Sequence, residues 1–88
     1  MKCACCGRKK KLLESFENIG KGGSVCVDCS DILYRIHDAV TEKNVEEYAL
    51  RKKSIEDFVQ KKKATEAFKV WFDEDFIKRN PMPEKKDK

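Results

Sequence analysis

Apolar side chains recur at helical spacing through the middle of the chain. In the segment 31–43, apolar positions fall four, seven and eight residues apart, and residues at these intervals lie on one side of an α-helix. The residues on this face are Ile32, Ile36, Ala39 and Val40, with Leu33 and Tyr34 beside it. The pattern predicts an amphipathic helix that packs on a core through this face.

A second helical segment follows directly, and its first residues carry a capping signal. Asn44 stands three residues before Glu47, the spacing of a capping box with an amide in place of the usual hydroxyl. The helix is therefore predicted to begin near Val45 and to bury Val45, Tyr48 and Ala49, with Leu50 alongside. Ser54 with Asp57 offers a second, weaker start signal.

Aromatic residues form a stripe in the last helical segment, at about 64–78. The members of the stripe are Phe68, Trp71, Phe72 and Phe76. Two interpretations stay open: the rings close the core of a small protein, or they form a docking surface edged by the acids Asp73–Asp75. If some of these rings stayed exposed outside the core, they would favour self-association, for example as a homodimer. The pattern does not decide whether 45–78 is one bent helix or two.

Composition limits the class of protein. Of the 88 residues, 41% are charged and 40% hydrophobic, which is too polar for a membrane protein and too apolar for a fully disordered one. The chain shows no signal-peptide pattern and no run of the roughly 18–20 apolar residues that a membrane span needs. We therefore expect a cytoplasmic protein with no membrane partner. Residues 80–88 hold both prolines and are predicted to be a disordered tail.

Cysteines are the most informative residues, and all five lie within residues 1–30. A cytoplasmic location and an odd count both argue against a disulfide framework. Cys3 and Cys6 form one C-x2-C pair, and Cys26 and Cys29 form a second pair after nineteen intervening residues. Four thiolates in two such pairs suit the tetrahedral shell of one structural Zn²⁺ ion. An iron–sulfur centre could use the same ligands, but nothing in the sequence suggests electron-transfer partners.

Gly7 supports Cys3 and Cys6 as the ligands of the first pair. The turn after Cys6 needs a residue that tolerates a positive φ, as glycine does without steric cost, and the Gly7 amide can point back at a cysteine sulfur. Cys5 is left without an assigned role. It is either a reactive thiol whose pKa is lowered by the neighbouring Arg8–Lys10, or a spectator. We prefer the spectator, because no base or resolving cysteine is evident.

The residues between the two cysteine pairs predict a short hairpin. Its apolar side chains are Leu12, Leu13 and Phe16. A glycine-rich tip follows at Gly20–Gly23. The second cysteine pair then runs straight into the first helix, for which Asp28 or Ser30 is the expected N-cap.

The treble-clef arrangement consists of a tight turn, or knuckle, that carries two ligands, then a hairpin, and then a helix whose first turn carries the last two ligands. Residues 3–33, with the segments CACCGRK and GGSVCVDCSDIL, resemble the small treble-clef zinc-finger modules of bacterial and phage proteins. They are similar to a bacterial domain family of unknown function with the pattern C-x2-C-G-K, a glycine-bearing turn and C-x2-C. The resemblance implies zinc ligands at Cys3, Cys6, Cys26 and Cys29. The chain departs from the pattern in the extra Cys5 and in Arg8, where lysine is common.

These patterns predict a small α+β protein stapled by one zinc ion. A treble-clef finger would occupy residues 1–33, and two or three helices over 34–79 would pack on it. Catalysis has little support, because a closed four-thiolate zinc leaves no position for water. The sequence has a single histidine, His37, and shows no Ser/His/Asp or paired-carboxylate grouping. We expect His37 to be a partly exposed helix residue and the protein not to be an enzyme.

Two functional classes remain. The favoured one is a regulatory protein that binds another protein, as an adaptor or inhibitor of a larger cellular machine. The alternative is a nucleic-acid-binding protein that contacts phosphates through Arg8, Lys9, Lys10, Lys11, Arg51, Lys52 and Lys62. If 45–63 were one helix, Lys62 would lie on the same side as Arg51 and Lys52, since it follows Arg51 by about three turns. The net charge of +4 falls to about +2 once four thiolates bind one Zn²⁺, which is weak for an electrostatic binder.

Overall fold

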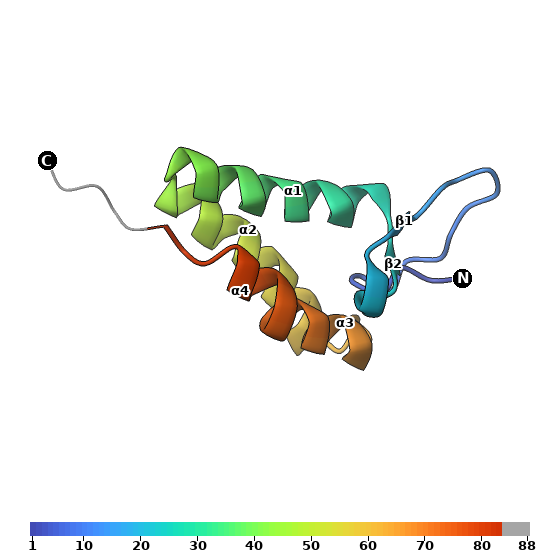
Figure 1. Cartoon of the computed structure of the whole chain (residues 1–88). Coiled ribbons are helices and arrows are strands. Elements are labelled where there is room, and N and C mark those ends of the chain that lie inside the picture. Colours follow the sequence, from blue (N-terminus) through green and yellow to red (C-terminus); the bar gives the residue numbers. More distant parts are fainter. Residues whose placement is uncertain (84–88) are drawn as a thin grey trace, which may run out of the picture.

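The computed structural model describes residues 1–83. A cysteine-bearing N-terminal segment and a small hairpin lie at one end, and helices make up the rest of the molecule (Figure 1). Strand β1 (Glu17–Asn18) pairs antiparallel with β2 (Ser24–Val25), and the one-turn 3₁₀ helix η1 (Gly20–Gly22) joins them. Within the described part of the chain, no helix is long and apolar enough to cross a membrane.

The first helix, α1 (Val27–Glu42), begins directly after Cys26. Cys26 is its N-cap and makes no side-chain capping bond, so the prediction of Asp28 or Ser30 as the cap was wrong. The Ser30 hydroxyl instead donates to the Glu17 carboxylate at 2.6 Å. The expected core face is present but rotated slightly: Leu33, Ile36 and Ala39 are buried, while Ile32 and Val40 are half-buried.

The second helix, α2 (Val45–Gln60), packs against α1 (Figure 1). The Asn44 side chain accepts a hydrogen bond from the Glu47 amide at 3.1 Å, so the predicted cap is confirmed. The Glu47 carboxylate does not reach back to close a capping box but pairs with Arg51 at 2.8 Å. The weaker start signal at Ser54 was wrong, because the helix continues through this position and the Ser54 hydroxyl donates to the Leu50 carbonyl at 3.3 Å.

Helix α2 ends at Gln60, and a separate helical segment begins at Glu66. Residues 45–78 therefore form two helical segments and not one bent helix. Thr65 caps α3 (Glu66–Trp71) by accepting from the Phe68 amide at 3.0 Å. The segment widens into the π-helix η2 (Phe72–Phe76) and ends with the short α4 (Ile77–Arg79). Before this helix, the Thr65 amide donates to the Ala4 carbonyl at 2.8 Å, which ties the helical part to the cysteine segment.

The aromatic stripe lies in the core. All four of its rings are buried: Phe68, Trp71, Phe72 and Phe76. The Phe72 and Phe76 rings stack with centroids 5.5 Å apart, and Trp71 packs on Phe76 at 5.4 Å. The stripe therefore closes the interior of the protein, and Trp71 and Phe76, which are buried but not fully, also line a surface cleft.

Asn80 departs from the prediction of a tail over 80–88. It is buried, its carbonyl accepts a hydrogen bond from the Tyr48 hydroxyl, and its side-chain oxygen lies 2.7 Å from Nδ1 of His37. Residues 81–83 have no regular secondary structure. Residues 84–88, also part of the predicted tail, lie outside the described residues.

Candidate metal centre and adjoining cleft

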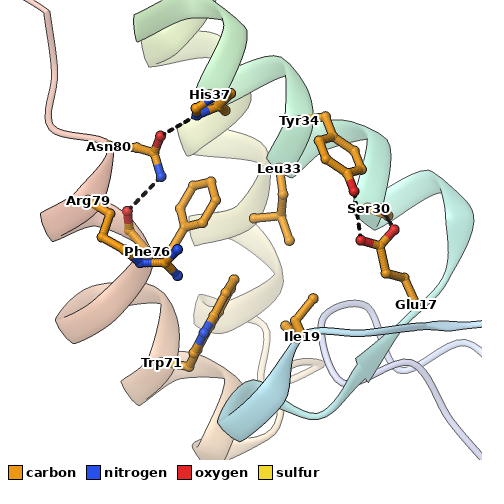
Figure 2. A pocket seen from close by; sticks show the side chains of 10 residues that line it. All are labelled: Glu17, Ile19, Ser30, Leu33, Tyr34, His37, Trp71, Phe76, Arg79 and Asn80. Carbon is orange, nitrogen blue, oxygen red and sulfur yellow. Dashed lines mark hydrogen bonds between the residues drawn. The ribbon is translucent and has the colours of Figure 1, made fainter.

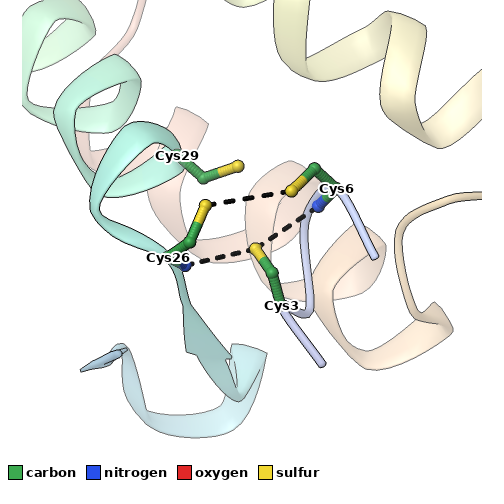
Figure 3. Close-up of side chains that lie close together, drawn as sticks. All are labelled: Cys3, Cys6, Cys26 and Cys29. Atoms are coloured by element: carbon green, nitrogen blue, oxygen red, sulfur yellow. Dashed lines mark hydrogen bonds between the residues drawn. The ribbon is translucent and has the colours of Figure 1, made fainter. Parts of the chain in front are cut away.

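Four cysteine sulfurs converge between the N-terminal turn and the start of α1 (Figure 3). The Sγ atoms of Cys3, Cys6, Cys26 and Cys29 all lie within 4.8 Å of one another. A tetrahedral ion with metal–sulfur bonds near 2.3 Å places its sulfurs about 3.8 Å apart. The Sγ atoms of Cys6 and Cys26 are 3.8 Å apart, so the cluster has the dimensions of a four-thiolate metal site.

Two local structures bring the sulfurs together. Cys3 and Cys6 come from a tight turn, and Cys26 and Cys29 come from the N-cap and the first turn of α1. The turn depends on Gly7, whose φ is +77°, as the sequence predicts. The Gly7 amide donates to the Cys3 carbonyl at 2.9 Å and not to a sulfur. A Cβ on Gly7 would also lie only 3.1 Å from the Lys63 carbonyl oxygen, so glycine is needed there for space as well as for conformation.

Cys3 is the sulfur best prepared to carry negative charge. The amides of Cys5 and Cys6 donate to its Sγ at 3.4 Å, and the Cys26 amide donates at 3.2 Å. A hydrogen bond from the Cys29 thiol, followed by these three amides, lowers the pKa of Cys3 to about 4 against the opposing effect of burial. Hydrogen bonds to the charged form favour that form. The structure therefore supplies three amide donors to the Cys3 sulfur.

Two of the other thiols hold their protons. Burial raises the pKa of Cys6 to about 11. The pKa of Cys29 is also raised, first because its thiol donates to the Cys3 sulfur. A cation that enters the cluster must displace these protons, since thiolates and not thiols ligate metal ions.

Cys5 lies beside the cluster without joining it. Its side chain is fully buried in the core, and its sulfur is not among the four grouped ligand atoms. It also contributes to raising the pKa of Cys29. The sequence could exclude Cys5 from the ligand set only by spacing, and the structure excludes it by position.

A cleft opens between α1, the hairpin and the C-terminal helical segment (Figure 2). Its volume is about 390 Å³. The apolar side chains in it are Ile19, Leu33, Trp71 and Phe76. At one end lies the Glu17 carboxylate, which accepts from the hydroxyls of Ser30 at 2.6 Å and Tyr34 at 2.8 Å. The Ser30 hydroxyl, followed by that of Tyr34, lowers the pKa of Glu17, so this end of the cleft is anionic.

The opposite end of the cleft is lined by an ion pair and by an amide. Arg79 lies there with its Nε 2.8 Å from the Asp75 carboxylate. His37 is exposed on α1, as expected, and its Nδ1 contacts the buried Asn80 side chain (Figure 2). Sequence reasoning missed this cleft, because residues 17, 37 and 79 belong to three separate elements and no local pattern links them.

The basic residues proposed for nucleic-acid contact come from three separate segments, and three of the seven are in ion pairs. Arg8 donates both guanidinium ends to Glu14, while Arg51 pairs with Glu47 and Lys52 with Glu56, as in i,i+4 helix pairs. Lys62 lies in the turn after α2 with a φ of +61°. The premise that one helix over 45–63 aligns Lys62 with Arg51 was therefore wrong.

Comparison with known proteins adds no further information on the site. No protein-family model, no curated protein and no solved structure matches this chain. Its function must be inferred from the arrangement of its own residues.

Proposed function

We propose that the chain is a non-enzymatic, zinc-stabilised regulatory protein that binds another protein as an adaptor or inhibitor. The observation that carries the metal assignment is the convergence of Cys3, Cys6, Cys26 and Cys29 within 4.8 Å. Four thiolates at tetrahedral spacing are the donor set of structural zinc sites. With all four positions filled by sulfur, the ion would hold the fold and take no part in chemistry.

The elements around the cluster support a treble-clef finger. A tight turn supplies the first two sulfurs, a two-stranded hairpin follows, and α1 supplies the last two from its N-terminal end. The Cys26 amide, at the N-terminus of α1, donates to the Cys3 sulfur. The free amides of a helix N-terminus favour negative charge, and a zinc ion with four thiolates carries a net charge of −2.

The cleft supports a binding role and not a catalytic one. Both of its hydroxyls, on Ser30 and Tyr34, donate to Glu17, and the His37 ring contacts Asn80 and neither hydroxyl. An apolar floor between the Glu17 carboxylate and the Arg79–Asp75 ion pair suits an apolar side chain of a partner peptide that is flanked by charged or polar residues. Protein binding would then use the cleft, with Trp71 and Phe76 as its floor.

Native mass spectrometry and chelation test the zinc site. We expect one Zn²⁺ per chain. Because the hydrophobic core of so small a domain is limited, its stability should depend on the metal, and chelation should abolish the cooperative unfolding transition. Cys29→Ser should lower the metal affinity, whereas Cys5→Ser should leave the stoichiometry at one. A metal-free chain that keeps its fold would contradict the proposal.

Charge inversion at the two ends of the cleft tests the binding role. The variant E17R/R79E should lose partners that the native chain captures from a cytoplasmic extract, since the charge of Glu17 is reversed and the Arg79–Asp75 ion pair becomes a like-charge pair. Lys53→Glu, an exposed change on α2, serves as the control and should retain them. Circular dichroism checks that both variants fold. Equal capture by both variants would remove the cleft from the proposal.

A further inference from the structure

The loop that leads from Arg8 to the hairpin carries two adjacent leucines near its middle that are left outside the core. Leu12 is 91% exposed and Leu13 is 94% exposed, although both were predicted to supply apolar side chains to the hairpin. The loop extends away from the helices, on the same side as the N-terminus (Figure 1). Two neighbouring leucines at such a tip are the least expected apolar surface of the molecule, because a small protein has few apolar side chains to leave outside its core.

The backbone holds the leucines outward. Leu13 has a φ of +68°, a left-handed conformation that favours glycine and asparagine and costs free energy for leucine. Glu14 closes the turn below the tip: its carboxylate accepts from the Lys11 amide at 2.9 Å, and its own amide donates to the Lys11 carbonyl at 3.1 Å. Arg8 clamps the same carboxylate. The exposed tip is therefore braced and not a loose end.

Positive charge surrounds the tip. Lys9, Lys10 and Lys11 precede the leucines directly. Met1 and Lys2 lie alongside: Lys2 forms an isolated β-bridge with Lys9, and the Lys10 amide donates to the Met1 carbonyl at 2.8 Å. Over residues 1–83, none of these lysines takes part in an ion pair. The one acid of the loop, Glu14, is neutralised by Arg8, so the tip presents uncompensated cations around exposed apolar side chains.

We propose that this basic leucine tip, residues 9–13 with the adjoining Met1 and Lys2, docks on the surface of an anionic lipid bilayer. Leu12 and Leu13 would enter the boundary between headgroups and acyl chains, and the lysines would contact lipid phosphates. Apolar insertion and attraction to anionic lipids are the two terms that drive peripheral membrane binding.

The shape of the tip favours a bilayer over other anionic partners. The loop that carries the leucines extends away from the helices (Figure 1), and both side chains are almost fully exposed, so they can enter a flat interface without a matching groove. Nucleic acid would use the lysines but would offer nothing to the leucines. The acids Asp73–Asp75 lie in η2, within the helical part and away from the tip. The proposal goes beyond the proposed function, and it replaces the sequence-based expectation of no membrane partner, which considered only spanning segments.

Vesicle sedimentation of the full chain tests the proposal. Native protein should bind vesicles of equimolar phosphatidylcholine and phosphatidylglycerol, with an affinity that falls as salt is raised. It should not bind phosphatidylcholine vesicles measurably. Failure to bind the mixed vesicles at low salt would overturn the proposal, as would equal binding to both vesicle types.

The variant L12Q/L13N separates binding from folding. Both side chains become polar, and asparagine adopts the left-handed conformation of residue 13 more readily than leucine does, so the stability should be kept or raised. Binding to the mixed vesicles should nevertheless fall by at least about tenfold. Leu50→Gln, at another exposed leucine on α2, should leave the binding unchanged. Full binding by L12Q/L13N would overturn the insertion.

Charge variants test the lysines in the same way. K9Q/K10Q/K11Q should lose at least about tenfold in affinity. A control with the same net charge changes exposed lysines elsewhere, at Lys53, Lys61 and Lys69, and should lose much less. Equal losses would show attraction by net charge alone and would overturn docking through the tip. E17R/R79E should bind vesicles like the native chain. Vesicle binding through the tip and partner binding at the cleft can then be distinguished.

Self-association is the main competing outcome. Sedimentation velocity should show the same mass for native protein and L12Q/L13N in the absence of lipid. Concentration-dependent assembly that L12Q/L13N abolishes, without vesicle binding by the native chain, would show that the tip docks on a second copy and would overturn the proposal.

Discussion

Gly22 to alanine is expected to loosen the contact between the hairpin and the C-terminal helical segment. A Cβ on Gly22 would lie 2.8 Å from Cδ1 of Ile19 and 2.9 Å from two ring atoms of Trp71, whereas ordinary contacts begin at 3.4 Å. Ordinary contact would therefore require the neighbours to move by about half an ångström. Overpacking of this kind costs about 1–3 kcal/mol, and the lower unfolded-state entropy of alanine returns about 0.4–1 kcal/mol. We expect a net loss of about 1–2 kcal/mol.

Urea unfolding at a fixed metal concentration measures this loss. Trp71 is the only tryptophan, so its fluorescence follows both the unfolding and the displacement of the ring. Lys21→Ala, an exposed change in the same turn, is the control and should stay within about 0.5 kcal/mol of the native chain. Gly22→Ala should cost less in an Ile19→Val background, which removes Cδ1. A Gly22→Ala protein as stable as the native chain would refute the steric reasoning.

Three further changes have defined outcomes. Hydrogen bonds from Arg8, followed by the Lys11 amide, lower the pKa of Glu14 from 4.5 to about 2, so the stabilisation from these contacts is present above pH 4.5 and is lost as the pH falls through 2. Arg8→Met should return the pKa of Glu14 toward 4.5 in a carboxyl NMR titration, and an unchanged pKa would exclude the pairing. Asn44→Ala removes the acceptor for the Glu47 amide and should cost about 1 kcal/mol in urea unfolding, whereas Asn44→Asp should not. Zinc uptake should release protons, including that of Cys29, seen in calorimetry as heats that differ between buffers of different ionisation enthalpy.

The features that the sequence predicts are local ones. The spacing of the C-x2-C pairs identifies the four converging sulfurs, because a short turn can place only certain positions on one ion. The positive φ of Gly7 follows from the same turn. The cap at Asn44 follows from a three-residue interval that needs no tertiary partner.

The features that the sequence misses depend on distant partners. Ser30 looks like a helix cap, but its hydroxyl contacts Glu17 across the hairpin. Asn80 precedes a proline and looks like the start of a tail, but Tyr48 and His37 hold it in the interior. No interval along the chain encodes these contacts, because each needs the packed helices first.

Leu12 and Leu13 show a different kind of failure. Their hydrophobicity led to the expectation that they supply apolar side chains to the hairpin. The turn closed by Glu14 directs them away from the core. The pattern of apolar residues does not predict this backbone conformation.

The hydrogen bond from the Thr65 amide to the Ala4 carbonyl has a consequence for how the chain folds. It joins two residues about sixty positions apart, and closing a loop of that length costs about 3–4 kcal/mol of chain entropy beyond a constant term. The closures between the cysteine pairs and between α1 and α2 are far shorter. We expect metal binding and the α1–α2 hairpin to form early, and the docking of α3 on the cysteine turn to form last and to limit the folding rate. The finger and the helical part would then be successive stages of one folding event, and a peptide that ends at residue 33 would bind zinc without reaching the native arrangement of its turn.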